Sequence, residues 1–281
     1  MSKSSMSLAM IDRRNQTVVK SVPFPDAQNP HMIPPPETVI WHYVRFDYFQ
    51  TLLKNRALWF TRLDKQSDKT DGTYSDVNGS EMTTVTKELV SSLGIVEMPN
   101  QTQLYQTNEI IRKRAYVHCW SMRSQESAWM WNAFLQSEAR SVAIRSTIGR
   151  LGAALHGQPV EFLRIIYYPP GIPRPDWSYT APFSAKDKMK HREERELRLL
   201  SVNDIGAADE PENKSFPTDV KALIGKVVVH PLSSPEFLNE VRSELKLCSI
   251  NAHVARSGLQ SWDLQAAGHI KTHDGYGDNH K

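Results

Sequence analysis

Ala115-Tyr-Val-His-Cys-Trp-Ser-Met122 is the most strand-like stretch of this 281-residue sequence, and a helix-like pattern follows it from Glu126 to Leu135. β-branched and aromatic residues give the first segment its strand character. Strand-like and helix-like segments alternate in the same way on both sides of this pair. The sequence therefore predicts an α+β (mixed α/β) fold, a single domain with a mixed β-sheet core flanked by helices.

Further strands are predicted where β-branched and aromatic residues cluster, at 38–44, 57–61, 141–145, 160–168 and 226–230. Further helices are predicted at 46–55, near 81–93 and 103–113, at 147–155 with Ser146 or Thr147 as cap, and from Pro235 onward. Ser234-Pro235-Glu236 is the clearest helix start, because it joins a capping hydroxyl, a first-turn proline and an acid that suits the helix dipole.

Both ends of the chain lack the pattern of a core. Residues 1–36 are polar and end in Pro34-Pro35-Pro36, which favours extended geometry over helix. Residues 271–281 are rich in Gly, Asp and His and show no apolar periodicity. We expect a flexible leader at 1–36, one α+β domain at 37–262 and a disordered tail at 263–281.

The charge of the chain is nearly balanced, with 34 Lys and Arg against 31 Asp and Glu. A dedicated nucleic-acid binder is therefore not indicated. Cys119 and Cys248 are too few for a disulfide framework or a four-cysteine metal site, which favours a reducing compartment. The N-terminus lacks the apolar stretch of a signal peptide, and no apolar run approaches a membrane span. We expect a soluble, cytoplasmic protein of bacterial type without a membrane partner.

The first segment that could carry chemistry is Trp41-His42-Tyr43-Val44-Arg45. On a strand, Trp41, Tyr43 and Arg45 share one face, and His42 lies on the other with Val44. An arginine at the end of a strand beside two aromatic rings could hold a phosphate or carboxylate. It could equally leave the sheet and pair at the surface.

The second segment is Trp120-Ser121 with the following Trp129 and Trp131. On a helix the last two rings lie about 200° apart and cannot both face one core. At least one tryptophan is therefore free for a partner, a loop or a planar ligand. Ser121 at the strand's end could bond a ligand or cap the next helix.

The third segment is the charged run from His191 to Arg198. If a strand begins at about 194, Glu194, Glu196 and Arg198 share one face. Two carboxylates about 7 Å apart repel each other, so the pKa of one should rise, which would suit an acid–base pair. If the run is helical, the charges form a solvated surface. His118 and Cys119, as adjacent strand residues, should point to opposite faces, which favours a buried structural thiol.

These segments, in this order, resemble a bacterial family known as domain of unknown function 2971. The likeness spans about residues 40–260, and the family name implies no function. The residues that carry it are Tyr43-Val-Arg45, Leu58-Trp-Phe-Thr61, Asp68, Asp71-Gly72, Cys119-Trp-Ser121, Trp131, Tyr167, Glu194-x-Glu196-x-Arg198, Val229-His-Pro231 and Ser257-Gly-Leu259.

Arg45 on an early strand, Ser121 at the end of a middle strand and Glu194-x-Glu196 late in the chain also resemble the Arg-Ser-Glu pattern of ADP-ribosyltransferases. The resemblance implies NAD as substrate, an unknown acceptor and no metal. Glu196 would face the ribose cation, Glu194 would activate the acceptor and Ser121 would buttress the glutamate. Arg45 would hold the diphosphate. The implied cofactor-binding set is Arg45, Tyr43, His42, Trp120, Trp131 and Arg198.

The sequence departs from that pattern, because Trp120-Ser121-Met122 stands where Ser-Thr-Ser is often found. Two alternatives therefore stay open. One is a non-catalytic nucleotide-binding or interaction module. The other is a metal-dependent nuclease or phosphodiesterase, in which Asp64, Asp68 and Asp71 join the two glutamates as oxygen ligands.

Overall fold

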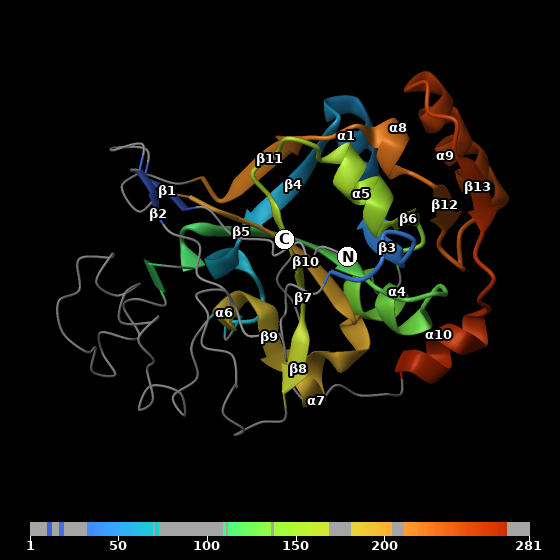
Figure 1. The fold of residues 1–281 in the computed structure, drawn as a ribbon. Coiled ribbons are helices and arrows are strands. Elements are labelled where there is room, and N and C mark those ends of the chain that lie inside the picture. The colour runs from blue at the N-terminus through green and yellow to red at the C-terminus, as the bar shows by residue number, and fades with distance from the viewer. Residues whose placement is uncertain are drawn as a thin grey trace, which may run out of the picture.

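A mixed sheet of nine strands organises the fold (Figure 1). The computed structural model describes residues 10–12, 17–19, 33–69, 71–72, 109–110, 112–135, 138–168, 181–203 and 211–268. Neighbouring strands follow the order β11-β4-β5-β3-β6-β12-β13, while β10 pairs with both β5 and β7. Within this sheet the β12–β13 pair is parallel and the others are antiparallel. The predicted α+β fold with a mixed sheet is confirmed.

The strands of the sheet are β3 (Val39–Arg45), β4 (Ala57–Arg62), β5 (Ala115–Ser121), β6 (Ser141–Thr147), β7 (Glu161–Arg164), β10 (Glu196–Val202), β11 (Asn213–Pro217), β12 (Lys226–Val229) and β13 (His253–Arg256). The helices beside it are α1 (Phe46–Asn55), α4 (Ala128–Leu135), α5 (Ile148–Ala154), α8 (Val220–Leu223), α9 (Pro235–Leu247) and α10 (Ser261–Gly268). The hydroxyls of Thr147 and Ser234 cap α5 and α9 as predicted.

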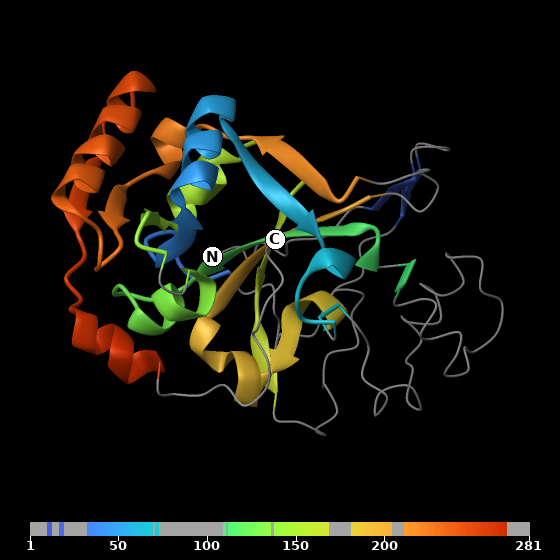
Figure 2. The ribbon, with the colours of Figure 1, turned by 180° about the vertical axis from the view of Figure 1, so that it is seen from behind.

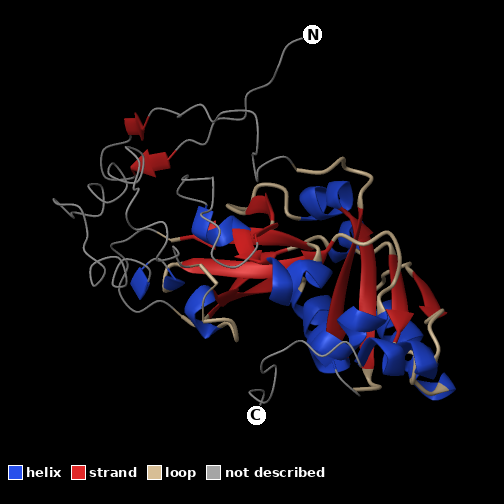
Figure 3. Ribbon diagram, turned by 90° about the horizontal axis from the view of Figure 1, so that it is seen from below, coloured by secondary structure: helices blue, strands red, loops and turns tan. Residues whose placement is uncertain are grey.

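Two apolar clusters lie on opposite faces of the sheet, and Figures 2 and 3 show helices on both sides of the strands. The larger cluster joins one face to α1, α5, α8 and α9. The second cluster joins Trp41 and Tyr43 of β3 to α4 and α10. Alternation along β3 explains the division, because Ile40 packs in the first cluster and Trp41 in the second.

β5 forks the sheet. One of its edges pairs with β10 over its whole length. The other edge pairs with β4 near its start, through Thr61 and Val117, and with β3 near its end, through Trp41 and Ser121. Between these points β3 and β4 diverge from β5.

A smaller parallel sheet lies next to β7 and β10 and consists of β8 (Ile166–Tyr168) and β9 (Ala185–Asp187). The short helices α6 (Ala181–Ser184) and α7 (Lys188–His191) flank β9, and a 3-10 turn η3 (Arg192–Glu194) leads into β10. The predicted strand 160–168 is therefore wrong as a single strand. The chain leaves the main sheet at Ile165, whose N–H bonds to the carbonyl of Glu196.

Some sequence predictions fall partly outside the described residues. The short strands β1 (Met10–Asp12) and β2 (Thr17–Val19) pair within the predicted leader. α10 crosses the predicted boundary at 262, and Leu264 is buried. The predicted helix at 81–93 and the residues after 268 lie outside the description. Among the described helices, none has both the length and the apolar character to cross a membrane.

Candidate functional site

Glu196 opens β10 at the junction with the preceding turn. Glu194 belongs to the 3-10 turn, and Arg195 after it adopts a left-handed conformation with φ of 46°. The predicted strand start at 194 is therefore wrong, and Glu194 does not share the strand face of Glu196 through alternation. The turn brings the two carboxylates together by a different route, through a shared cation.

Glu196 is 2% exposed, and its carboxylate has three partners. Its Oε1 accepts from Arg198 Nε at 2.7 Å and from Cys119 Sγ at 2.9 Å. Its Oε2 lies 2.7 Å from Lys186 Nζ. Because Cys119 and Arg198 are cross-strand partners on β5 and β10, the sheet register itself sets part of this geometry.

Arg198 links the strand to a loop that follows β4. Its guanidinium donates to both carboxylate oxygens of Asp71, at 2.8 and 2.6 Å, and to the carbonyl of Phe183 at 2.9 Å. The side chain is 1% exposed. The paired geometry is the strong, bidentate form of an arginine–carboxylate contact.

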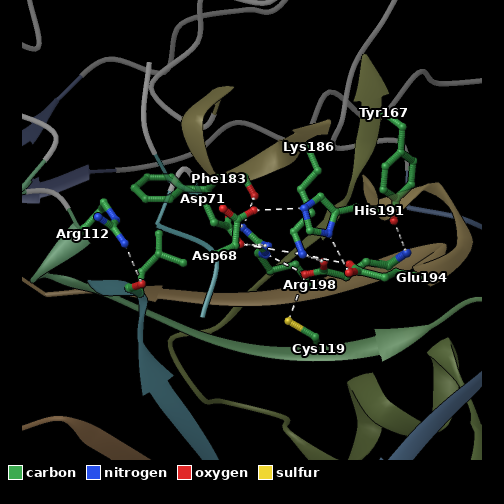
Figure 4. Close-up of polar contacts among 12 residues, drawn as sticks. Asp68, Asp71, Arg112, Cys119, Tyr167, Phe183, Lys186, His191, Glu194 and Arg198 are labelled. Carbon is green, nitrogen blue, oxygen red and sulfur yellow. Dashed lines mark hydrogen bonds and ion pairs between the residues drawn. The ribbon is translucent and has the colours of Figure 1, made fainter. Parts of the chain in front are cut away.

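Lys186 of β9 lies among three carboxylates (Figure 4). Its Nζ is 2.7 Å from Glu196, 2.8 Å from Glu194 and 3.8 Å from Asp71. One ammonium group therefore occupies the centre of a carboxylate cluster.

His191 completes the network. Its Nδ1 lies 2.9 Å from Glu194 and its Nε2 lies 3.2 Å from Asp68. Burial by itself lowers the pKa of His191, but the bonds to Asp68 and Glu194 raise it to about 9. The ring is thus positively charged at neutral pH. Four carboxylates face three cationic side chains in what we call the charged cluster: Asp68, Asp71, Glu194 and Glu196 with Lys186, His191 and Arg198.

The electrostatics differ from the sequence prediction. Burial would raise the pKa of Glu196, but Arg198 and Lys186 lower it well below its usual range. The expected rise from carboxylate repulsion is therefore wrong for Glu196, because the cations outweigh the neighbouring acids. Burial, reinforced by the charge of Glu196, raises the pKa of the Cys119 thiol well above normal. The thiol donates a hydrogen bond instead of acting as a thiolate.

Two neutral side chains fix the backbone around the charged cluster. Ser121 Oγ donates to the carbonyl of Glu194 at 2.7 Å, so it neither caps α4 nor touches a carboxylate. The N–H of Glu196 donates to the hydroxyl of Tyr167 at 2.8 Å. Both contacts hold the turn from which Glu194 and Glu196 project.

The structure brings together Ser121, Glu194, Glu196 and Arg198 of the predicted site residues, but it leaves Arg45 apart. Arg45 pairs with Asp47 at 2.9 Å, and its guanidinium lies 4.7 Å from the ring centre of Tyr48. It is 41% exposed. Four residues of strand, about 13 Å, separate it from the position that pairs with Ser121.

The predicted aromatic residues lie elsewhere. Tyr43 and Trp131 pack edge to face in the second apolar cluster, with ring centres 4.9 Å apart. Trp120 is buried in the larger cluster, and His42 contacts its ring from β3. Trp120 and Cys119 alternate along β5, so the rings of Trp120 and His42 lie on the face of the sheet opposite to Glu196, whereas Tyr43 and Trp131 belong to the cluster on the other face.

Sequence reasoning missed Lys186, His191 and the structural role of Tyr167. The strand Glu196-Leu-Arg-Leu-Leu200 carried a signal, because charges between apolar residues of a buried strand need buried partners. Nothing in the sequence selects Lys186 from its neighbours Lys188 and Lys190.

The three aspartates of the metal-dependent nuclease alternative have different partners in the structure. Asp64 pairs with Arg62 at 2.7 Å, whereas Asp68 and Asp71 approach the glutamates through His191, Arg198 and Lys186. In the described part of the chain, no three His, Cys, Asp or Glu side chains gather in a way that could hold a metal ion.

No family model matches the chain, and no curated protein matches it. Among solved structures it is similar to Thermus sp. 2.9 DarT in complex with NAD+, at a TM-score of 0.37 and 13% identity, covering 79% of this chain and 96% of that one. The same protein in complex with carba-NAD+ matches at 0.37 and 14% identity, covering 79% and 96%. Its complex with ADP-ribosylated ssDNA matches at 0.37 and 13%, covering 79% and 95%. A likeness this distant establishes neither fold nor activity.

Proposed function

We propose that this chain is an NAD-dependent ADP-ribosyltransferase-like enzyme with Glu196 at its reaction centre. One observation carries the proposal: Glu196 is withdrawn from water, and yet Arg198 and Lys186 hold it ionised. Cleavage of the nicotinamide–ribose bond builds positive charge on the ribose, as glycoside hydrolysis does. A fixed, ionised carboxylate in a dry site stabilises that charge far better than water can.

The reaction assigned to the site is a displacement at the ribose carbon that carries nicotinamide. The carbon–nitrogen bond breaks, and its electron pair leaves with nicotinamide, which becomes neutral. Glu196 faces the cationic ribose. An oxygen or nitrogen of the acceptor then bonds to the carbon, and the proton it releases passes to Glu194.

Substrate access requires movement of Lys186, because its ammonium covers both glutamates. β9 carries this lysine and, among the described strands, pairs with β8 rather than with the main sheet. The ammonium and the ribose cation would compete for the same carboxylates. The proposal therefore includes displacement of β9 when NAD binds.

The proposal rests on this geometry and not on the similarity to DarT, whose structures are described with NAD+ and with ADP-ribosylated ssDNA. The acceptor stays open. Single-stranded DNA and protein from a cell lysate are therefore both offered in the test.

The test is incubation of the purified chain with NAD labelled in its ADP-ribose part, with nicotinamide release and label transfer measured. Glu196→Gln should lower both rates by about 10²-fold or more, because it removes the charge that faces the transition state. Glu193→Gln is the matched control. Glu193 is a neighbouring glutamate, 41% exposed and paired with Arg123, and its loss should leave both rates unchanged.

Two results would count against the proposal. The first is wild-type protein that releases no nicotinamide with either acceptor. The second is a folded Glu196→Gln variant as active as wild type, with folding checked by circular dichroism and thermal unfolding.

A second candidate function is a non-catalytic nucleotide-binding module. It is favoured by one observation, namely that every carboxylate of the charged cluster is already engaged by a cation. Calorimetry separates the two. Binding of NAD without any nicotinamide release supports the module over the enzyme.

A further inference from the structure

The two oxygens of the Glu196 carboxylate have different surroundings. Oε1 accepts hydrogen bonds from Arg198 Nε and Cys119 Sγ. Oε2 is buried, and among the described residues no donor is aligned to form a hydrogen bond with it. Lys186 Nζ lies 2.7 Å from Oε2 as an ion-pair partner. When Lys186 moves away, Oε2 is therefore the oxygen left open to a ligand.

Tyr167 and Lys186 approach the glutamates from the same side (Figure 4). The two residues are register partners of the parallel pair β8–β9, so their side chains project from the same face of that small sheet. Burial, followed by the charges of Glu196 and Glu194, raises the pKa of Tyr167. Both carboxylates thus lie within electrostatic reach of the tyrosine hydroxyl.

The hydroxyl of Tyr167 uses only part of its hydrogen-bonding capacity. A tyrosine hydroxyl can accept one hydrogen bond and donate another. That of Tyr167 accepts from the N–H of Glu196 at 2.8 Å. In the described part of the chain no group accepts its proton, the two glutamates included. A half-buried tyrosine normally donates its proton to a partner, so this donor is available to a ligand.

Two hydrogen bonds keep Tyr167 beside Glu196 independently of β9. The N–H of Ile165 donates to the carbonyl of Glu196 at 3.1 Å, and the N–H of Glu196 donates to the hydroxyl of Tyr167. Both main-chain polar groups of Glu196 are thus bonded to the segment that contains Tyr167. The displacement of Lys186 that the proposed function requires therefore removes the ammonium and leaves the tyrosine hydroxyl in place.

A ligand group that satisfies both atoms must donate to Glu196 Oε2 and accept from Tyr167. A hydroxyl does this with a single oxygen atom. An ammonium group only donates, and an ionised phosphate oxygen only accepts. A carboxylate oxygen beside a tyrosine hydroxyl therefore favours a hydroxyl group of the ligand.

We propose that Tyr167 is a substrate-binding residue, which donates a hydrogen bond to a hydroxyl of the ribose next to nicotinamide while that hydroxyl donates to Glu196 Oε2. The inference rests on the proposed function, in which Glu196 faces this ribose. It adds a determinant of specificity. The site distinguishes a ribose from a deoxyribose, because a missing hydroxyl leaves Tyr167 and Oε2 without their partner.

The test is a double-mutant cycle between the protein and its substrate. Nicotinamide release is measured for wild type and Tyr167→Phe with NAD and with two analogues, which lack the 2′- or the 3′-hydroxyl of the ribose next to nicotinamide. The loss of kcat/KM caused by Tyr167→Phe should be about 3- to 10-fold larger with NAD than with one of the analogues. The different intrinsic reactivity of the analogues cancels in this ratio.

Two variants control for other effects. Tyr48→Phe makes the same chemical change at a 58% exposed tyrosine and should leave kcat/KM unchanged for all three substrates. Ser121→Ala removes another bond that holds the turn, the one to the carbonyl of Glu194, and its effect should be equal for all three substrates. An equal loss on all three substrates for Tyr167→Phe as well would overturn the proposal and leave Tyr167 as a brace for the turn.

Failure of the proposed function gives a different result. If wild type binds NAD without releasing nicotinamide, the same ratios are taken from dissociation constants measured by calorimetry, and equal ratios again overturn the inference about Tyr167. A wild-type protein that neither binds nor cleaves NAD overturns both.

A second measurement does not depend on the folding of Tyr167→Phe. Fluorotyrosine placed at position 167 alone keeps the hydroxyl and gives a single fluorine NMR signal. That signal should shift on saturation with a non-cleavable NAD analogue, and it should shift less with at least one counterpart that lacks a ribose hydroxyl. A signal that does not move at saturation overturns the proposal.

Discussion

The two faces of β5 bury polar side chains by opposite means. One face carries Cys119 and Ser121 toward the charged cluster, and the other carries His118 and Trp120 into the fork. The two sets are one residue apart in sequence. On the first face the buried charges have partners of opposite sign, whereas on the second the partly buried histidines are neutral and His118 keeps a nitrogen without a hydrogen-bond partner.

Burial alone therefore does not set the charge of a side chain. Desolvation acts against ionisation on both faces. On the charged face, Arg198 and Lys186 overcome it and Glu196 stays ionised. In the fork the described residues place no anion beside His118 to oppose it, and His118 stays neutral. Each face should therefore respond differently to mutation and to pH.

The largest effect is expected from Arg198→Met. The change leaves Asp71 and Glu196 with one buried cation fewer, and breaking a buried pair on one side costs about 3–5 kcal/mol of unfolding free energy. Urea denaturation measures the loss. Arg192→Met, at a 62% exposed arginine, is the control and should cost less than about 1 kcal/mol. A loss that small for Arg198→Met would show that the charged cluster contributes little to stability.

The second prediction concerns His191 on the charged face. Its folded pKa of about 9 exceeds the ordinary value of 6.5, so its stabilisation is complete below about pH 6.5 and is lost as pH rises through 9. The shift corresponds to about 3 kcal/mol. As pH rises from about 6.5 through 9, the unfolding free energy should therefore fall less steeply in His191→Gln than in wild type. Parallel pH profiles for the two proteins would rule out a charged His191.

The third prediction concerns His118 in the fork and has the opposite sign. The unfolded chain binds a proton at this ring near pH 6.5, whereas the folded protein does so only near pH 3. Stability is therefore lost as pH falls below 6.5, by about 2 kcal/mol at pH 5 from this ring. His118→Gln should remove that part of the acid loss, as measured by urea denaturation at pH 7.5 and pH 5. An unchanged difference between the two pH values would contradict the neutral, buried ring.

The alternation of side chains along single strands was enough to predict much of the difference between the two faces of β5. The sequence placed His118 and Cys119 on opposite faces of a strand at 115–122, and the structure confirms both the strand and the division. It also placed one helix cap at Ser234 and another at Ser146 or Thr147, of which the structure selects Thr147. These features depend on neighbours within a few residues, which a sequence pattern records.

The parts that were not predicted depend on contacts between distant residues. The turn at Glu194 and the left-handed Arg195 move the strand start to Glu196, and no periodicity marks that shift. Lys186 reaches Asp71 from 115 positions further along the chain (186 − 71). The fork exists because β3 and β4 pair with different ends of β5, which only the folded sheet reveals.

The smallest effect is expected from Arg45→Met, which distinguishes the two roles predicted for that arginine. The sequence allowed it to hold a diphosphate or to pair at the surface. In the structure it bonds to Asp47, 64% exposed, and lies over Tyr48, so its removal should cost less than about 1 kcal/mol. If the reaction centre is at Glu196, the KM for NAD should also stay within about twofold of wild type, since losing one phosphate-binding arginine costs about tenfold or more. A rise of that size, without loss of stability, would return Arg45 to the binding site and require β3 to approach the charged cluster when NAD binds.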